Sequence, residues 1–359
     1  MKKLRICTVV GARPQFIKCA PVSREIRKHF NEILIHTGQH YDYNMSQSFF
    51  DELNIPEPDY NLGIGSDNHG AQTGKMLLEL ENVLLKIKPN LVMVYGDTNS
   101  TLAGALSAAK LQIPVAHVEA GLRSFNRQMP EEINRIVADK LSKYLFVPTQ
   151  TAFDNLTKEG QTTGIYKVGD VMFDSFLYNL EHSNADKVLE KFQLNSKHYF
   201  LTTIHRPQNT DNPTILKALI STLQNLPELV IFPIHPRTRK LMRTYNITVN
   251  SQNLKLVEPV SYQEMIVLEK NAKIIITDSG GVQKESYFAG VPCIVLRGET
   301  EWVELVENGW AVLLGNRYEE LPQVIKSFRS FQPGIEKLYG DGHASRKIAE
   351  NLISNNYGK

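Results

Sequence analysis

Residues 91–121, LVMVYGDTNSTLAGALSAAKLQIPVAHVEAG, contain two short apolar runs separated by a helix-like segment. The runs cover residues 91–95 and 115–118, and the segment 100–110 between them is rich in alanine and leucine. Strands that are apolar on both faces and joined through a helix form parallel sheets, because helices then cover both faces. This stretch therefore predicts one strand–helix–strand unit of an α/β fold.

The same alternation continues along the whole chain. Further strands are predicted at 6–10, 33–36, 144–147, 165–168, 199–203, 230–234, 254–256, 274–277 and 293–296. Further helices are predicted at 16–28, 71–86 and 131–141. The polar stretch 178–197 is the predicted join between two doubly wound, Rossmann-like α/β domains. Ligands bind such domains beyond the carboxyl ends of the strands. We therefore expect functional residues in the strand-end loops and a ligand cleft between the domains.

The composition is that of an ordinary folded protein. The 359 residues include 40 Lys and Arg against 38 Asp and Glu, a net charge of +2, and 42% are hydrophobic. These values exclude disordered, collagen-like and disulfide-stapled chains, and the near-neutral charge argues against a nucleic-acid partner. No apolar run approaches the roughly 18 residues of a membrane span or the length of a signal-peptide core. Cys7, Cys19 and Cys293 show no paired spacing, so we expect a cytoplasmic protein with no membrane partner.

The first predicted strand ends in a glycine turn that leads into a helix. Gly11 is followed by Arg13 and Lys18. Exposed N–H groups at a helix start bind anions, and the two cations would add to that attraction. An ordinary turn with solvated basic residues is the alternative.

Three carboxylates follow strands or open a helix in the first half of the chain. Asp97 follows the strand 91–95, Glu119 follows the strand 115–118, and Glu131 begins the helix 131–141. Carboxylates that converge on one crevice favour acid–base chemistry, because they raise one another's pKa. The alternatives are that Asp97 caps the helix after it and that Glu131 complements the helix dipole.

The second half carries a histidine and a glycine-rich turn in equivalent places. His205 follows the strand 199–203, and Ser279, Gly280 and Gly281 follow the strand 274–277. Small residues at a helix start let backbone N–H groups approach a phosphate, and Glu285 could accept hydrogen bonds from ribose. His205 could carry a proton or be a buried structural histidine.

Motifs for a nicotinamide cofactor, a P-loop or a zinc site fail on spacing. Gly63 and Gly65 lack a third glycine, the segment 70–75 is one residue short for a P-loop, and the histidines lack zinc-type partners. We expect no cofactor and no metal.

Taken together, seven motifs resemble the non-hydrolysing UDP-N-acetylglucosamine 2-epimerase family. They are GARPQFIK (11–18), GDT (96–98), HVEAGLR (117–123), PEEINR (130–135), HR (205–206), TDSGGVQKE (277–285) and YGDG (339–342), in the family's order.

The resemblance implies a glycosyltransferase-B-like fold with domains 1–170 and 171–343 and a C-terminal helix, 344–359, that returns to the first domain. It implies a homodimer, activation by a second UDP-sugar, and C2 epimerisation of UDP-N-acetylglucosamine for surface polysaccharide precursors. The residues that match the family's catalytic set are Asp97, Glu119, Glu131 and His205. The residues that match its UDP-binding set are Arg13, Lys18, Ser279, Gly280, Gly281 and Glu285.

Some positions depart from the common family pattern. Ala12 and Gln15 replace Thr and Glu, the loop 124–130 is about two residues short, and Trp302 replaces an Arg. These features resemble the branch that acts on UDP-2,3-diacetamido-2,3-dideoxy-glucuronate, in which Arg127 would grip the sugar carboxylate. A solvated Arg127, a hydrolysing relative and a UDP-sugar glycosyltransferase are the alternatives.

Overall fold

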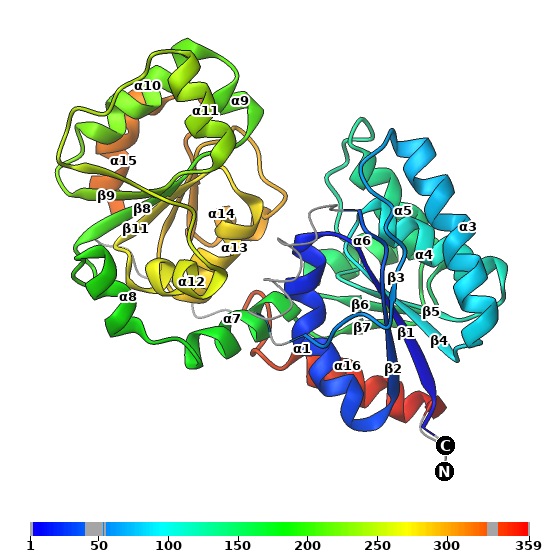
Figure 1. Cartoon of the computed structure of the whole chain (residues 1–359). Coiled ribbons are helices and arrows are strands. Elements are labelled where there is room, and N and C mark those ends of the chain that lie inside the picture. Colours follow the sequence, from blue (N-terminus) through cyan, green and yellow to red (C-terminus); the bar gives the residue numbers. More distant parts are fainter. Residues whose placement is uncertain (1–2, 40–52, 54, 329–336, 358–359) are drawn as a thin grey trace. The chain divides into compact units, whose positions relative to one another are not determined.

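The structure is a computed structural model that describes residues 3–39, 53, 55–328 and 337–357. The chain divides into two compact units (Figure 1). The first unit comprises Met1–Leu177 and Lys337–Lys359, and the second comprises Tyr178–Glu336. The domain boundaries expected from the sequence were 170/171 and 343/344, and helix α7 (Val171–Glu181) crosses the first junction between the units.

The first unit is built on a seven-stranded parallel sheet in its described residues, with the order β3-β2-β1-β4-β5-β6-β7. The strands are β1 (Arg5–Val10), β2 (Asn31–His36), β3 (Tyr60–Asn61), β4 (Leu91–Tyr95), β5 (Val115–Val118), β6 (Tyr144–Val147) and β7 (Ile165–Lys167). The helices are α1 (Arg13–His29), α3 (His69–Ile87), α4 (Asn99–Lys110), α5 (Pro130–Leu141), α6 (Gln150–Lys158) and α16 (Ala344–Leu352). The strand order reverses between β1 and β4, and open α/β sheets bind ligands at the carboxyl ends of the strands where this reversal occurs.

The second unit repeats this plan with a six-stranded parallel sheet in its described residues, in the order β10-β9-β8-β11-β12-β13. The strands are β8 (Tyr199–Thr203), β9 (Leu229–Pro233), β10 (Leu254–Val257), β11 (Ile274–Thr277), β12 (Cys293–Val295) and β13 (Ala311–Leu313). The helices are α8 (Ala185–Phe192), α9 (Pro207–Thr210), α10 (Pro213–Gln224), α11 (Pro236–Thr244), α12 (Tyr262–Asn271), α13 (Gly280–Ala289), α14 (Val303–Glu307) and α15 (Leu321–Ser327). The order reverses between β8 and β11, and the predicted fold class of two doubly wound α/β domains is confirmed.

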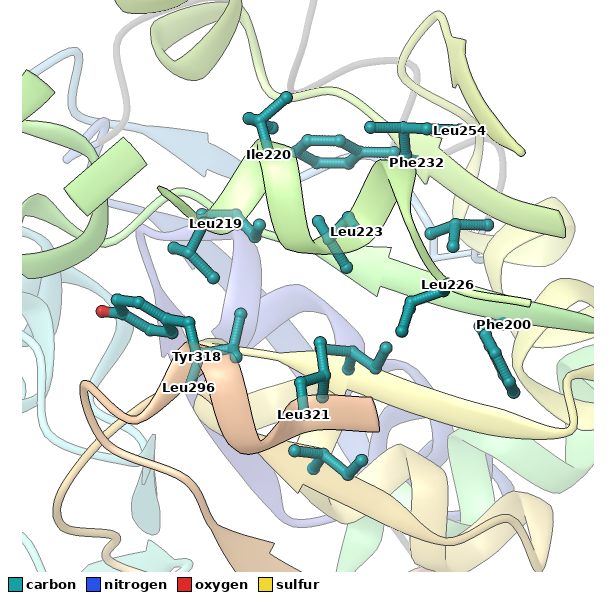
Figure 2. Close-up of a cluster of buried hydrophobic side chains, with 14 of the residues drawn as sticks. Phe200, Leu219, Ile220, Leu223, Leu226, Phe232, Leu254, Leu296, Tyr318 and Leu321 are labelled. Carbon is teal, nitrogen blue, oxygen red and sulfur yellow. The ribbon is translucent and has the colours of Figure 1, made fainter. Parts of the chain in front are cut away.

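A large apolar core holds the second sheet against its helices (Figure 2). Phe200 and Phe232 of the sheet pack in one cluster with Leu219 and Leu223 of α10 and with Leu321 of α15, and all five are fully buried. Burial of each such side chain contributes about 1.5–3 kcal/mol relative to exposure. This core fixes the strand ends from which the site loops of the second unit start.

The C-terminal helix α16 belongs to the first unit and packs against α1 (Figure 1). Its N-terminus is capped by Asp174 of α7, which accepts hydrogen bonds from the amides of Ala344 (2.9 Å) and Ser345 (2.7 Å). A carboxylate at a helix N-terminus satisfies free amides and complements the dipole. Among the described residues, none of the helices has the length and apolarity that a bilayer crossing demands.

Candidate functional site

A buried ion pair joins two residues of the predicted site in the first unit. The ammonium of Lys18, in α1, contacts the carboxylate of Glu119, directly after β5. Both residues are 9% exposed. Gly96, after β4, lies against the pair: a Cβ there would be 3.1 Å from Lys18 Nζ and 3.3 Å from Glu119 Oε2. Gly96 also has a φ of +60°, so a glycine suits this position both in space and in conformation.

Asp97 pairs with a cation rather than capping the next helix. Its carboxylate contacts the guanidinium of Arg135, in α5. The N-cap of α4 is Thr98, whose hydroxyl accepts a hydrogen bond from the amide of Thr101 (3.3 Å). The alternative in which Asp97 is the helix cap is therefore wrong. The Asp97 side chain remains 29% exposed, which leaves it accessible to a ligand.

The turn after β1 uses its backbone amides internally. The Gln15 side-chain oxygen accepts hydrogen bonds from the amides of Gly11 (2.8 Å) and Ala12 (3.0 Å). The Gln15 side-chain nitrogen donates to the carbonyl of Tyr95 (2.9 Å), so Gln15 ties this turn to the end of β4. The expectation that these turn amides bind an anion does not fit this arrangement. Arg13, the first residue of α1, is half-buried and supplies the positive charge of this loop.

The loop that follows Glu119 is organised by a carboxylate next to the predicted one. Glu132 is buried and accepts hydrogen bonds from the amides of Ser124 (2.9 Å) and Phe125 (3.0 Å). Glu131, in the first turn of α5, and Arg127, in the loop, are both exposed. Glu132 thus shapes the loop, while Glu131 and Arg127 are available to solvent and ligand.

In the second unit, His205 and Asp278 meet at adjacent strand ends. The Asp278 carboxylate is fully buried and accepts the backbone amides of His205 (3.1 Å) and Arg206 (3.0 Å). His205 Nδ1 lies 3.4 Å from Asp278 Oδ1. Burial lowers the pKa of His205, although Asp278 opposes the shift. His205 is therefore mainly neutral at pH 7, with one nitrogen able to accept a proton.

The start of α13 presents the predicted phosphate-binding turn. Ser279 is the N-cap and its amide donates to Thr277 Oγ1 (2.9 Å). Gly280 lets an acidic side chain approach the helix end, because a Cβ there would lie 2.5 Å from Glu301 Oε1. At Gly281 a Cβ would meet only Ser279, at 3.9 Å. The amides at this helix start carry the positive end of the helix dipole.

Glu285 lies deeper in the second unit, beside another carboxyl group. Glu285 is in α13 and is 5% exposed, and Glu269, in α12, is fully buried. Burial and the neighbouring Glu285 raise the pKa of Glu269 well above its ordinary value. Both effects favour the protonated form of Glu269.

The structure brings the predicted residues together in two groups, one in each unit. Lys18, Asp97 and Glu119 lie at the carboxyl ends of the first sheet, with Arg13 at the start of α1. The residues of the second group, at the corresponding end of the second sheet, are His205, Ser279, Gly280 and Gly281. Sequence reasoning missed the roles of Arg135, Asp278 and Glu269; for Asp278, its place directly after a buried strand was an available signal.

Proteins of one known family resemble this chain along nearly its whole length. The sequence profile of UDP-N-acetylglucosamine 2-epimerases matches residues 24–353. A UDP-N-acetylglucosamine 2-epimerase homolog of Methanococcus maripaludis is 54% identical over 97% of this chain and 99% of its own length. The UDP-2,3-diacetamido-2,3-dideoxy-D-glucuronate 2-epimerase of Pseudomonas aeruginosa is 47% identical, again over 97% of this chain and 99% of its own.

A solved structure agrees with these sequence relatives. The crystal structure of Methanocaldococcus jannaschii UDP-GlcNAc 2-epimerase in complex with UDP-GlcNAc and UDP superimposes with a TM-score of 0.86. It is 45% identical and covers 99% of this chain and 100% of its own. With the strand-end carboxylates and the turn at α13 in their expected places, the chain belongs to the UDP-N-acetylglucosamine 2-epimerase family.

Proposed function

We propose that this protein is an isomerase, a non-hydrolysing UDP-N-acetylglucosamine 2-epimerase that inverts C2 of the sugar. The observation that carries the proposal is the placement of Asp97 and Glu119 at neighbouring strand ends, each paired with a cation, in a chain 45–54% identical to proteins of this family. Paired carboxylates at a sheet's switch point suit proton transfer on a bound ligand.

The chemistry requires two half-reactions. The C2 proton has no adjacent carbonyl to acidify it, so its direct removal would leave an unstabilised carbanion. If the C1–O bond to UDP breaks as a base takes the C2 proton, the electron pair forms a C1=C2 double bond and UDP leaves as an anion. A proton then returns to the opposite face of C2, and UDP adds back to C1. The site must therefore supply a base, an acid and stabilisation of the departing diphosphate.

The first unit supplies the carboxylates in this proposal. Asp97, Glu119 and Glu131 exchange protons with the sugar, and Arg13 and Lys18 stabilise the charge that develops on UDP. Lys18 already contacts Glu119, so the arrival of a diphosphate would give Lys18 a second anionic partner. Charge-assisted hydrogen bonds of this kind are about twice as strong as neutral ones.

The second unit supplies the nucleotide site and one proton carrier. The amides of Gly280 and Gly281 and the hydroxyl of Ser279 donate to the phosphates, and Glu285 accepts from ribose hydroxyl groups. Burial lowers the pKa of His205, so its ring is neutral at pH 7 and has a nitrogen free to accept a proton as a general base.

A second candidate substrate is UDP-2,3-diacetamido-2,3-dideoxy-glucuronate. It is supported by the 47% identity to the Pseudomonas aeruginosa enzyme and by the exposed Arg127. Arginine grips a carboxylate with two parallel hydrogen bonds, so Arg127→Gln should reduce activity on the uronate about a hundredfold more than on the neutral sugar. Equal losses on both sugars would exclude this role for Arg127.

One experiment tests the reaction and its alternatives. The purified protein is incubated with each UDP-sugar in deuterated water and followed by NMR. We expect deuterium at C2 and a mixture of the two C2 epimers, with UDP still attached. Free N-acetylmannosamine would identify a hydrolysing enzyme, transfer of sugar to an added acceptor would identify a glycosyltransferase, and absence of C2 exchange would overturn the proposal.

We further propose that the protein is a cytoplasmic homodimer that supplies surface polysaccharide precursors and is activated by a second UDP-sugar. Leu78 and Leu85, seven residues apart in α3, are 66% and 51% exposed, and apolar residues exposed at helical spacing suit a subunit contact. The three cysteines are free and buried, which suits a reducing compartment. Light scattering of the parent protein and of Leu78→Lys measures the number of subunits. A sigmoidal dependence of the rate on substrate concentration that becomes hyperbolic when UDP-N-acetylglucosamine is added would reveal the activator.

A further inference from the structure

A fully buried histidine links the two strand ends that carry Asp97 and Glu119. His117 lies in β5 and has no solvent exposure. Its Nε2 is 2.7 Å from the carbonyl oxygen of Gly96, and its Nδ1 is 2.7 Å from Asp139 Oδ1, in α5. The imidazole ring therefore bridges the end of β4 and the helix α5.

Both partners of this ring are acceptors. The Gly96 carbonyl has no proton to give. The other oxygen of Asp139 accepts hydrogen bonds from Arg123 Nη1 (2.7 Å) and from the amide of Gly121 (3.2 Å). Burial alone would raise the pKa of Asp139, but the hydrogen bond from His117 and the charge of Arg123 hold it below its ordinary value. Since neither partner donates, each ring nitrogen must carry a proton.

The other charged groups near the ring are Arg123, Glu159 and Lys140. Arg123 makes a forked pair with Glu159, with distances of 2.6 Å from Nε and 2.8 Å from Nη2. Lys140 Nζ lies 3.9 Å from Glu159 Oε2, and the Glu159 side chain is 29% exposed. Arg123 is therefore shared between two carboxylates, and the buried Asp139 carboxylate (1% exposed) gains a further donor in the protonated Nδ1 of His117.

We propose that His117 is a positioning residue: in the folded protein it is a doubly protonated cation that fixes the Gly96–Asp97 turn for proton transfer. The inference rests on the proposed function, which gives Asp97 that task. The His117 proton holds the Gly96 carbonyl, and Gly96 in turn has a left-handed φ and lies against the Lys18–Glu119 pair. The next residue in the chain is Asp97, so the orientation of this one peptide affects both paired carboxylates.

The protonation state is measured directly in the parent protein. Long-range ¹⁵N–¹H correlation spectra of ¹⁵N-labelled protein distinguish a ring with two N–H groups from either neutral tautomer, and the His117→Gln variant assigns the signal. We expect two protonated nitrogens, because both hydrogen-bond partners of the ring are acceptors. A single protonated nitrogen in the signal assigned to His117 would overturn the proposal.

The positioning role is measured by kinetics. His117→Gln should lower kcat by at least about tenfold, because small misplacements of catalytic groups have effects of this size, while the affinity for UDP stays within about twofold. Glu32→Gln is the matched control: Glu32 is a buried carboxylate at the start of β2, held by Thr8 Oγ1 (2.6 Å) and Arg27 Nε (2.8 Å). We expect this control to lose stability and keep kcat.

Parental kcat in a folded His117→Gln variant would contradict the positioning role. Failure of the proposed function would look different. In that case the parent protein would show no C2 exchange, whereas the spectra would still report a doubly protonated ring.

Discussion

The ammonium of Lys18 contacts the carboxylate of Glu119 where β5 ends, and the two side chains are only 11% and 6% exposed. For a buried ion pair, the net free energy of keeping both charges is small, but the cost of removing only one of them is large. Attraction between the partners offsets the cost of removing both from water, whereas removal of one partner leaves the other charge buried alone.

We therefore expect Lys18→Met to lower the free energy of unfolding by about 3–5 kcal/mol and to abolish measurable turnover. The double variant Lys18→Met/Glu119→Leu should recover most of that stability and none of the activity. Urea denaturation and a coupled epimerase assay measure the two properties. A single variant as stable as the parent would show that the pair is not held in solution.

Asp97 and Thr98 are neighbours in sequence with separable tasks. Asp97→Asn removes the carboxylate that we propose carries a proton and should lower kcat by about a hundredfold or more. Thr98→Ala removes only the cap of α4 and should cost about 1 kcal/mol of stability with kcat retained. If Thr98→Ala is as inactive as Asp97→Asn, the loss in both variants reflects loop structure rather than proton transfer.

Glu269 gives the second unit a pH-dependent stability. Because burial and Glu285 raise its pKa in the folded state, folding takes up a proton between the unfolded and folded pKa values. The free energy of unfolding therefore falls as pH rises through that range. Glu269→Gln keeps the shape and removes the titration.

We expect the Tm of Glu269→Gln to exceed that of the parent at pH 8, by about 2–4 °C for each kcal/mol gained. The difference should shrink below about pH 4, where the carboxyl is protonated in both states. Glu258→Gln is the control, because the Glu258 side chain is 76% exposed, and it should show no such difference. A variant less stable than the parent at pH 8 would mean that Glu269 is ionised in the folded protein.

Glu301 places a negative charge near the start of α13. Its Oε1 lies 2.5 Å from where a Cβ of Gly280 would be, and its other oxygen pairs with Arg297 at 2.9 Å. A carboxylate there competes with a phosphate for the positive end of the helix. Glu301→Gln should therefore strengthen UDP binding about twofold to fivefold by calorimetry, whereas Glu299→Gln, at an exposed position nearby, should not. Weaker binding in Glu301→Gln would show that the carboxylate itself contacts the nucleotide.

The fold was largely predictable from the sequence because its strands are short, apolar and separated by helices. Residues 91–95 and 115–118 are β4 and β5 as predicted. The partners of the site residues were not predictable, because they depend on strand order. Arg135 meets Asp97 because β4 and β5 are adjacent and α5 follows them. The Gly11 amide points to Gln15 rather than to a ligand, a detail of side-chain packing that a glycine pattern does not contain.

The hydrogen bond from the Ser345 amide to Asp174 has a consequence for folding during protein synthesis. The first unit includes α16, which is synthesised after the whole of the unit Tyr178–Glu336. Domains fold as units during synthesis, so the first unit completes its structure only after the second unit has been made. Until then, the surface of α1 that α16 covers is open to solvent, and a nascent chain stalled before residue 344 exposes it to chaperones and proteases.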